Sequence, residues 1–364
     1  MKNLIRLNDR KELVETKEFL KLYLSQKNKG IENGYYFSIY FSLEDENTEA
    51  ARGVRINKIL KEAELCIKSQ LPSSVSKNIW NKFIKLRPYE IIQKSNTSVV
   101  FVGNENFAGF LYVPFNVSDK VIVARSLHLK PILEWLIQDD SFYLITLSSK
   151  KCRLLRGDSF NLFELDSVEL EDNEESTKEK KKIKTLKLIQ AAEDRFYQYL
   201  KKDNRPIILG GVLELHKYYL QANRDPDVIG EKIIGNLDKA SFSVLHQECL
   251  DILNEMRANR KNQTMSKIKE QRAYGRVLEN LHEIAMAAIQ GKVKSLLVAN
   301  DVNVWGSINK ATGDINSCTK KNISIPEDDV LDDLAEVVLA RGGEVVICKQ
   351  RDIPSAREAV ALLR

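Results

Sequence analysis

The sequence has little cysteine and histidine, and this scarcity argues against several kinds of site. The five cysteines lie far apart with no Cys-x-x-Cys pair, which is typical of reduced cytosolic thiols rather than a disulfide framework or a zinc site. The four histidines show no spacing typical of a metal or catalytic centre. Walker, Gly-x-Ser-x-Gly and His-Glu-x-x-His motifs are missing as well. We therefore expect no metal and no cofactor.

Long apolar runs are also missing. No run approaches the roughly 20 residues that span a bilayer. The first residues, MKNLIRLNDRKELVE, are charged throughout and contain no apolar signal core. These absences predict a cytoplasmic protein without a membrane partner.

What the sequence does contain is typical of a globular protein of several domains. Its 364 residues are 43% hydrophobic, and the net charge of +5 is compatible with a polyanionic partner without requiring one. Shifts in pattern predict three domains, at 1–136, 137–260 and 261–364. Strands that alternate with helices predict a mixed α/β (α+β) fold.

The first domain is predicted to combine a small sheet with basic helices. Hydrophobic spacing predicts helices at 9–27, 49–71, 74–92 (interrupted by Pro88) and 131–138. Aromatic and β-branched runs predict strands at 35–41, 98–102, 107–113 and 121–124. Because Gly103, Asn104 and Asn106 lie between the second and third of these strands, we expect a β-hairpin there.

The central domain is predicted to be mixed α/β. Strands are expected at 142–147, 152–155, 160–168 and 205–209, and helices at 186–200 and 212–222, with a turn at Gly210-Gly211. The stretch 169–184 has almost no apolar residue and joins an acidic block to a basic one. We interpret this stretch as a solvated loop.

The third domain follows a long helical region. We expect a helix at 242–258 that continues, kinked or broken, into a charged helix, and a further helix at 267–289. Strands are expected at 295–299 and 344–348, with a helix between them that opens at Ile325 and ends at Gly342-Gly343. Asp328, Asp329, Asp332 and Asp333 are interpreted as charges at the start of that helix. The last residues, AREAVALLR, are expected to form a short helical turn and then a strand.

Three stretches together resemble one family. The C-terminal part resembles the third domain of archaeal and eukaryotic release factors and Pelota, in LLVANDVNVWG and in the run from IPEDDVLDDLAEVVLARGGEVVICKQ to the final Leu-Arg. The central part is similar to the bacterial archaeo-eukaryotic release factor families, in particular family 3, in LHLKPILEWLIQDDSFYLITLSSKKCRLLRGD and RPIILGGVLELHKYYLQANRDP. FSIYFSLEDENTEAARGVRINKILKEAE resembles the opening of the first domain. The resemblance implies a ribonuclease-H-like central domain and a kink-turn-protein-like α/β/α third domain.

The departures from this family pattern bear on function. Release factors carry Gly-Gly-Gln in the second domain, but the two Gly-Gly pairs here are followed by Val212 and Glu344. The stop-codon tetrapeptide Asn-Ile-Lys-Ser is also missing from the matching region, about 46–58. The resemblance therefore implies a ribosome-bound protein that does not terminate synthesis, acting in rescue, stalling or dormancy. It also implies a translational GTPase or another protein as partner of the third domain.

Two basic sets are candidates for RNA binding. Arg52, Arg55, Lys58 and Lys61 recur at three-residue steps along one gradually rotating helix face, in a domain with further basic residues at Lys68, Lys77, Lys82, Lys85 and Arg87. The second set is Arg257, Arg260, Lys261, Lys267, Lys269 and Arg272, continued by Arg276. For both sets the alternative is a solvated helix surface.

Other functions remain open. Cys152, between Lys151 and Arg153, has basic neighbours that favour a reactive thiolate, but an ordinary strand cysteine is the preferred interpretation. His216 has no second ligand at helical spacing and is not interpreted as a metal site. A protein-binding adaptor and an atypical hydrolase that uses 169–184 or the surroundings of Cys152 are the alternatives.

Overall fold

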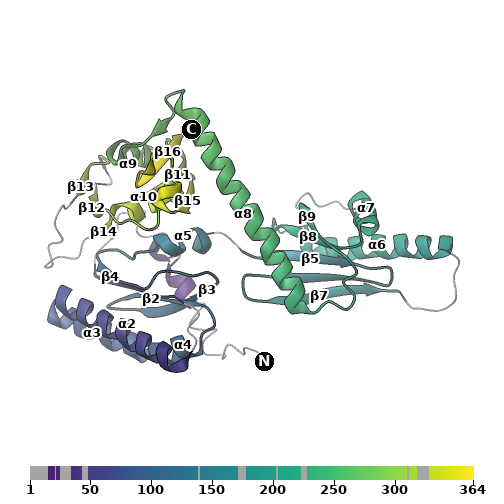
Figure 1. Ribbon diagram of the computed structural model, residues 1–364, viewed down its shortest axis with the longest axis horizontal. Helices are drawn as coiled ribbons and strands as arrows, with labels where there is room; N and C mark the ends of the chain where they lie inside the picture. The colour runs from purple at the N-terminus through teal and green to yellow at the C-terminus, as the bar shows by residue number, and fades with distance from the viewer. Residues whose placement is uncertain are drawn as a thin grey trace. The chain divides into compact units, whose positions relative to one another are not determined.

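The computed structural model describes residues 15–20, 22–24, 34–42, 48–137, 140–170, 178–201, 204–222, 228–309, 311–317 and 328–364. The chain divides into two compact units, one formed by Met1–Leu136 with Gln263–Arg364 and the other by Ile137–Asn262 (Figure 1). Both units combine sheets and helices, so the predicted mixed α/β class is confirmed. The division into three domains and their likeness to named folds stay predictions. Among the described residues, no helix is long and apolar enough to cross a membrane.

The N-terminal part of the first unit is an antiparallel sheet covered by helices. Its strands are β1 (Tyr36–Phe41), β2 (Ser98–Asn104), β3 (Ala108–Val113) and β4 (Lys120–Ala124), in the order β3-β2-β1-β4. One face of the sheet packs against α2 (Glu49–Gln70), α3 (Ser73–Lys85) and α4 (Pro88–Lys94). Alternate residues of β1, Phe37, Ile39 and Phe41, face these helices. The predicted hairpin and helices are confirmed, and the helical 15–20 and 22–24 lie within the predicted helix 9–27, whose other residues lie outside the described ones.

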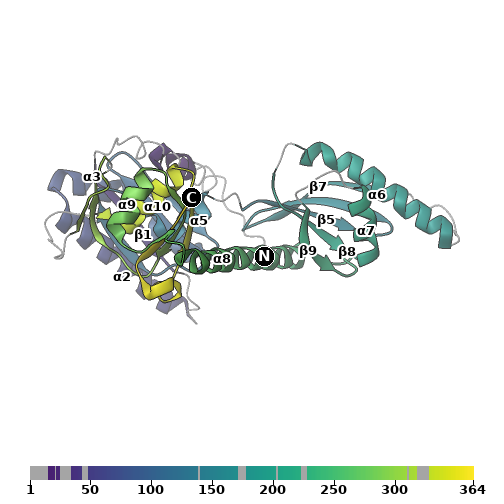
Figure 2. The ribbon, with the colours of Figure 1, turned by 90° about the horizontal axis from the view of Figure 1, so that it is seen from above.

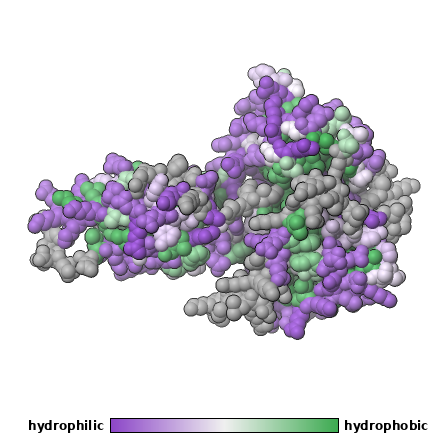
Figure 3. All heavy atoms as spheres, turned by 180° about the vertical axis from the view of Figure 1, so that it is seen from behind, coloured by the Kyte–Doolittle hydropathy of each residue, from purple (hydrophilic) through white to green (hydrophobic). Residues whose placement is uncertain are grey.

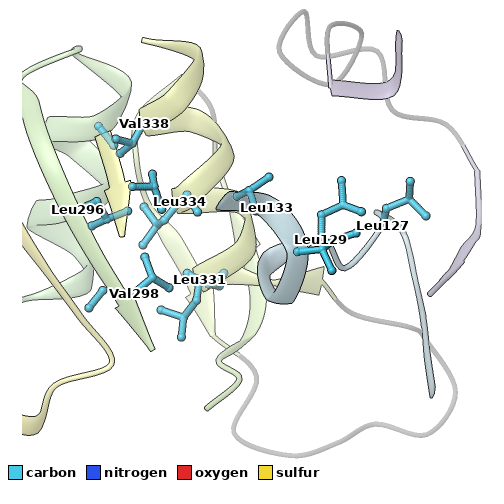
Figure 4. Close-up of a cluster of buried hydrophobic side chains, with 14 of the residues drawn as sticks. Leu127, Leu129, Leu133, Leu296, Val298, Leu331, Leu334 and Val338 are labelled. Atoms are coloured by element: carbon cyan, nitrogen blue, oxygen red, sulfur yellow. The ribbon is translucent and has the colours of Figure 1, made fainter. Parts of the chain in front are cut away.

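The opposite face of this sheet shares a core with the C-terminal part of the chain. Val100, Val102 and Leu111 belong to the same buried cluster as residues of α5 (Lys130–Ile137) and α10 (Val330–Ala340). Figure 4 shows Leu127, Leu129 and Leu133 beside Leu331 and Leu334, with Leu296, Val298 and Val338 beyond them. Segments far apart in the sequence are therefore one folded body.

The C-terminal part of the first unit has two sheets. In the larger one, β10 (Val277–Leu278), β16 (Ala359–Leu363), β11 (Val293–Ala299) and β15 (Glu344–Cys348) follow in that order, with only β11 and β15 parallel. The helices α9 (Leu281–Ile289) and α10 pack on it. The smaller sheet joins β13 (Ile315–Ser317), β12 (Trp305–Ile308) and β14 (Asp328–Asp329). The predicted final strand is confirmed as β16, whereas the short 3-10 turns, at Gln350–Asp352 and Pro354–Ala356, lie earlier in the chain than the expected helical turn.

A buried polar cluster connects the two parts of this unit. Lys130 Nζ lies 2.7 Å from Asp329 Oδ2 and donates to the carbonyl of Val302 at 2.6 Å. Asp329 also accepts from Asn303 Nδ2 at 2.6 Å and from the Leu331 N–H at 3.1 Å, so it caps α10. The expected start of this helix at Ile325 lies outside the described residues, and the described helix begins at Val330.

The second unit is a five-stranded sheet with helices on both faces. The strands β5 (Phe142–Leu147), β6 (Lys151–Gly157), β7 (Leu162–Glu169), β8 (Ile207–Gly211) and β9 (Val228–Ile234) lie in the order β7-β6-β5-β8-β9. Strands β8 and β9 run parallel to β5, and β6 and β7 form an antiparallel meander with it. The helices α6 (Lys178–Leu200) and α7 (Leu213–Ala222) cover one face, and the beginning of α8 (Phe242–Arg272) covers the other (Figures 1 and 2).

Three predictions about the bounds of elements were wrong, two for helices and one for a strand. Residues 178–184, predicted as loop, are the first turns of α6, because lysine and glutamate support a helix without apolar residues. The helix α8 is continuous over 31 residues, so 267–272 belong to it, and β10 separates it from α9. Gly210-Gly211, predicted as a turn, ends β8. Strand β9 was not predicted, since Gly230 and two charges interrupt its pattern.

Candidate nucleic-acid interface

The helix α2 presents two of the predicted RNA-binding residues to solvent. Thr48 caps the helix by accepting from the Ala51 N–H at 3.2 Å, and Ile56, Ile59, Ala63 and Ile67 form its buried side. Lys58 and Lys61 lie on the opposite side and are exposed. They are flanked at helical spacing by Val54 and Leu65, which are 72% and 68% exposed. This α2 stripe, Val54, Lys58, Lys61 and Leu65, can offer two ammonium groups and apolar contact to the same partner.

The other two residues of that set hold the domain together. Arg55 forms a two-pronged ion pair with Asp119, at 2.7 and 2.8 Å, and its guanidinium lies over the ring of Phe41. Arg52 donates to the carbonyl of Ser95 at 2.7 Å. On a helix, residues three positions apart differ in direction by about 60° around the axis. The four basic side chains therefore point in successively different directions, from the side of the sheet at Arg52 and Arg55 to the solvent at Lys58 and Lys61. Arg52 and Arg55 therefore serve contacts within the protein.

The remaining basic residues near α2 are mostly dispersed. Lys77, Lys85 and Arg87 are exposed, and Lys82 is half-buried. Arg87 lies 3.9 Å from Glu90, and Lys68 pairs with Glu64 one helical turn away. Exposed pairs of this kind contribute little to stability and exchange readily with other partners.

The second predicted set does not form one stripe on α8. Arg257 donates to Asn254 and Arg272 pairs with Glu279 at 2.9 Å, so both engage neighbouring side chains. Lys267 and Lys269 are exposed on either side of buried Ile268, about 200° apart around the helix. Arg260 is exposed, Lys261 is half-buried, and Arg276 follows the helix at an exposed position. This set is a charged helix surface rather than a single face.

A third basic surface was missed in the sequence because it was interpreted as loop. In the first turns of α6, Lys180, Lys184 and Lys187 follow at spacings of four and three residues and are exposed. These three residues, the α6 stripe, lie along one side of the helix for about 10 Å. Helical spacing within the lysine run was the signal that would have revealed it. Hydrophilic residues likewise dominate the described surface of the face drawn in Figure 3.

Cys152 and His216, considered for catalysis and metal binding, are both buried. Cys152 belongs to the core of the second unit, where burial raises the pKa of its thiol to about 12, which favours the preferred interpretation of an ordinary strand cysteine. Burial lowers the pKa of His216. No group of three or more metal-binding side chains occurs among the described residues.

Comparisons with known proteins identify relatives of this chain. Residues 141–292 match the family model of the bacterial archaeo-eukaryotic release factor family 3. Pelota from Archaeoglobus fulgidus is 16% identical, with 74% of this chain and 80% of that chain covered and a TM-score of 0.36. Dom34 from S. cerevisiae, which interacts with Hbs1, is 12% identical, with 74% of each chain covered and a TM-score of 0.41. Ribosome-bound archaeal Pelota is 12% identical, with 94% and 93% covered and a TM-score of 0.43.

No curated protein matches the chain. The family model nevertheless covers the sheet and helices of the second unit and continues through α9. Over residues 141–292 it confirms the predicted resemblance of this chain to the bacterial archaeo-eukaryotic release factor family 3.

Proposed function

We propose that this protein is a cytoplasmic, ribosome-associated, release-factor-like factor that acts in ribosome rescue, stalling or dormancy without hydrolysing peptidyl-tRNA. The match of residues 141–292 to a release factor family carries the proposal. That match supports a role in translation, and the missing Gly-Gly-Gln argues against termination.

The exposed lysines support contact with ribosomal RNA. The α2 stripe and the α6 stripe each place ammonium groups about one helical turn apart, a spacing that can neutralise neighbouring phosphates. We expect these phosphates to be bound by the lysines of the two stripes, Lys58, Lys61, Lys180, Lys184 and Lys187. Lys267 and Lys269 are weaker candidates because they point to different sides of α8.

Co-sedimentation of the purified protein with 70S ribosomes across a salt series tests this proposal. We expect binding that weakens as salt rises. The double variant Lys58→Glu/Lys61→Glu should weaken it and reduce the salt slope by about one for each phosphate that the variant no longer neutralises. The matched control is Lys292→Glu/Lys294→Glu, which makes the same charge change at two exposed positions, one just before β11 and one within it. Arg52 and Arg55 are unsuitable test positions, since their replacement would break the bonds to Ser95 and Asp119.

Absence of co-sedimentation at every salt concentration would contradict ribosome association. Equal weakening in the test and control variants would instead show that only net charge matters, and would remove the α2 stripe from the proposal. Either result is interpretable only if the variants keep the circular dichroism spectrum of the parent protein.

Peptide release is measured separately, with ribosomes that carry labelled peptidyl-tRNA. We expect no release above the rate without protein. Release that disappears in Glu174→Ala/Glu175→Ala would favour the hydrolase alternative, although both residues lie outside the described ones.

A translational GTPase, bound through residues 261–364, is the proposed protein partner. Dom34, one of the similar structures, interacts with Hbs1. Pull-down with the full chain as bait, with and without ribosomes, tests for such a partner. Recovery of no GTPase in either condition would leave the ribosome as the proposed partner and would count against the adaptor alternative.

A further inference from the structure

The second unit contains a pocket of about 360 Å³ that the proposed function does not use. Leu147 at the end of β5, Val212 after β8 and Gly235 after β9 all line it. The pocket therefore lies at the carboxyl ends of three neighbouring parallel strands. Open α/β sheets bind ligands at this end of their strands, and the volume is in the range of small-molecule sites.

Two glycines let the backbone come close together beside this pocket. Gly211 has a φ of +146°, and a Cβ on it would lie 2.5 Å from the carbonyl oxygen of Leu147. A Cβ on Gly210 would lie 2.6 Å from Leu237 Cδ1. The Gly235 N–H donates to the carbonyl of Gly211 at 3.1 Å, which fixes the segment after β9. The pair Gly210-Gly211 thus has a structural role in shaping the pocket wall.

One side of the pocket carries groups that bind phosphate oxygens. Ser148 and Ser149 follow β5, and Lys182 comes from the first turns of α6. Thr185 also lines the pocket, but its hydroxyl donates to the carbonyl of Lys181 at 2.9 Å. Hydroxyl groups and an ammonium group donate to anionic oxygens, and the charged donor forms the stronger bond. Lys182 is exposed, with its Nζ 5.7 Å from the centre of the Tyr218 ring, so its charged end borders the pocket.

The other side carries acceptors. Asn236 and Asp238 follow β9, and the Asp238 N–H donates to Asn236 Oδ1 at 3.1 Å, which orders the turn. Carboxylate and amide oxygens accept from the hydroxyl groups of a ligand. Because β9 is two strands away from β5, the donor and acceptor sides are about 10 Å apart.

The middle of the pocket is partly apolar. Leu147, Val212 and Leu215 line it, and Tyr218 donates its hydroxyl to Glu214 at 2.6 Å. Bare phosphate would satisfy Lys182 but would leave Asn236 and Asp238, about 10 Å away, without a partner. A nucleoside alone would leave Lys182 without an anion. A ligand that carries a phosphate at one end and hydroxyl groups at the other satisfies both sides.

We propose that this pocket binds a nucleotide, with its phosphate toward Ser148, Ser149 and Lys182 and its ribose hydroxyls toward Asn236 and Asp238. The same chemistry is offered by a free mononucleotide and by the terminal nucleotide of an RNA strand. The pocket lining includes none of the lysines of the α2 stripe or the α6 stripe, so its occupancy can be measured without ribosomes.

Isothermal titration calorimetry of the full chain without ribosomes tests the proposal with AMP, GMP, adenosine and inorganic phosphate as ligands. We expect saturable binding of AMP or GMP to one site, and weaker binding of adenosine and of phosphate. Lys182→Ala should weaken AMP binding by about tenfold or more, because a charge-assisted bond is removed. Asp238→Ala should weaken AMP binding and leave phosphate binding unchanged. The matched control is Lys181→Ala, an exposed lysine on the same helix that belongs neither to the pocket lining nor to the α6 stripe.

No saturable binding of AMP or GMP at millimolar concentration would overturn the proposal. So would equal weakening in Lys182→Ala and Lys181→Ala, since the effect would then come from the general charge of α6. Circular dichroism of each variant shows whether its fold is kept. Titration with an adenylate trinucleotide distinguishes a free mononucleotide from the end of an RNA strand. Tighter binding of the trinucleotide than of AMP indicates an RNA end, and failure of the trinucleotide to bind indicates a free nucleotide.

Discussion

Removing the charge of Lys130 should destabilise the first unit far more than removing an exposed charge. Lys130 and Asp329 are fully buried, at 0% and 1% side-chain exposure, and their charged atoms are 2.7 Å apart. In Lys130→Met the carboxylate of Asp329 stays buried without its lysine. Breaking a buried pair in this way costs about 3–5 kcal/mol. That is a large share of the roughly 5–15 kcal/mol typical of a folded domain.

The three tryptophans make this unit easy to observe. Trp80, Trp135 and Trp305 all lie in the first unit, so tryptophan fluorescence during urea unfolding reports on that unit alone. The control is Arg272→Met, which breaks a pair of similar length, 2.9 Å, whose partners are 55% and 22% exposed. An exposed pair contributes about 0–1 kcal/mol, so the midpoint of Arg272→Met should shift little.

The double variant Lys130→Met/Asp329→Asn sharpens the test. It removes both charges and keeps a side-chain oxygen that can cap α10. We expect it to be more stable than Lys130→Met, because no uncompensated charge remains in the core. Equal midpoints for Lys130→Met and Arg272→Met, or a double variant less stable than Lys130→Met, would refute the reasoning.

Three further predictions concern the second unit and the thiols. Gly211→Ala should lower the thermal midpoint measured by circular dichroism, at a cost of about 1–3 kcal/mol, because the new Cβ would crowd the Leu147 carbonyl; an unchanged midpoint would contradict the close approach. Iodoacetamide at neutral pH should modify Cys66, which is partly exposed, before Cys152, which is buried and has a pKa of about 12. Peptide mass spectrometry measures the order of labelling, and labelling of Cys152 before Cys66 would contradict the burial of Cys152. Burial lowers the pKa of His216 in the folded protein. As the pH falls, this histidine is therefore protonated in the unfolded chain before it is protonated in the folded one, so its contribution to the free energy of unfolding is complete above pH 6.5 and is lost below it. His216→Gln should flatten the fall in thermal midpoint over this acidic range, and an unchanged slope would contradict the assignment.

Local patterns in the sequence were sufficient for most elements of the first unit. The hairpin of β2 and β3 follows from β-branched runs around a turn, and α2 from apolar residues at helical spacing. Such signals lie within a few residues of one another. They therefore remain visible without knowledge of the fold.

Contacts between distant residues could not be predicted in this way. Arg55 and Asp119 are 64 positions apart, and only the folded sheet brings them together. The same holds for Lys130 and Asp329, 199 positions apart. A basic residue on a predicted helix is thus a candidate for RNA until the structure shows which residues already have an acidic neighbour. Lys58 and Lys61 remain candidates because they lie on the side away from the sheet.

The two Gly-Gly pairs show why a short motif has to be interpreted in its structural context. Gly342 has a φ of +73° at the end of α10, and a Cβ on Gly343 would lie 2.6 Å from Val338 Cγ1. Gly211 is likewise required by its close approach to the carbonyl of Leu147, and a Cβ on Gly210 would displace the end of the Leu237 side chain. Each pair therefore has a local structural reason, and neither needs to be explained as a displaced remnant of Gly-Gly-Gln. If this protein acts on a ribosome, its effect is therefore better sought in the exposed lysines of α2 and α6 than in its glycines.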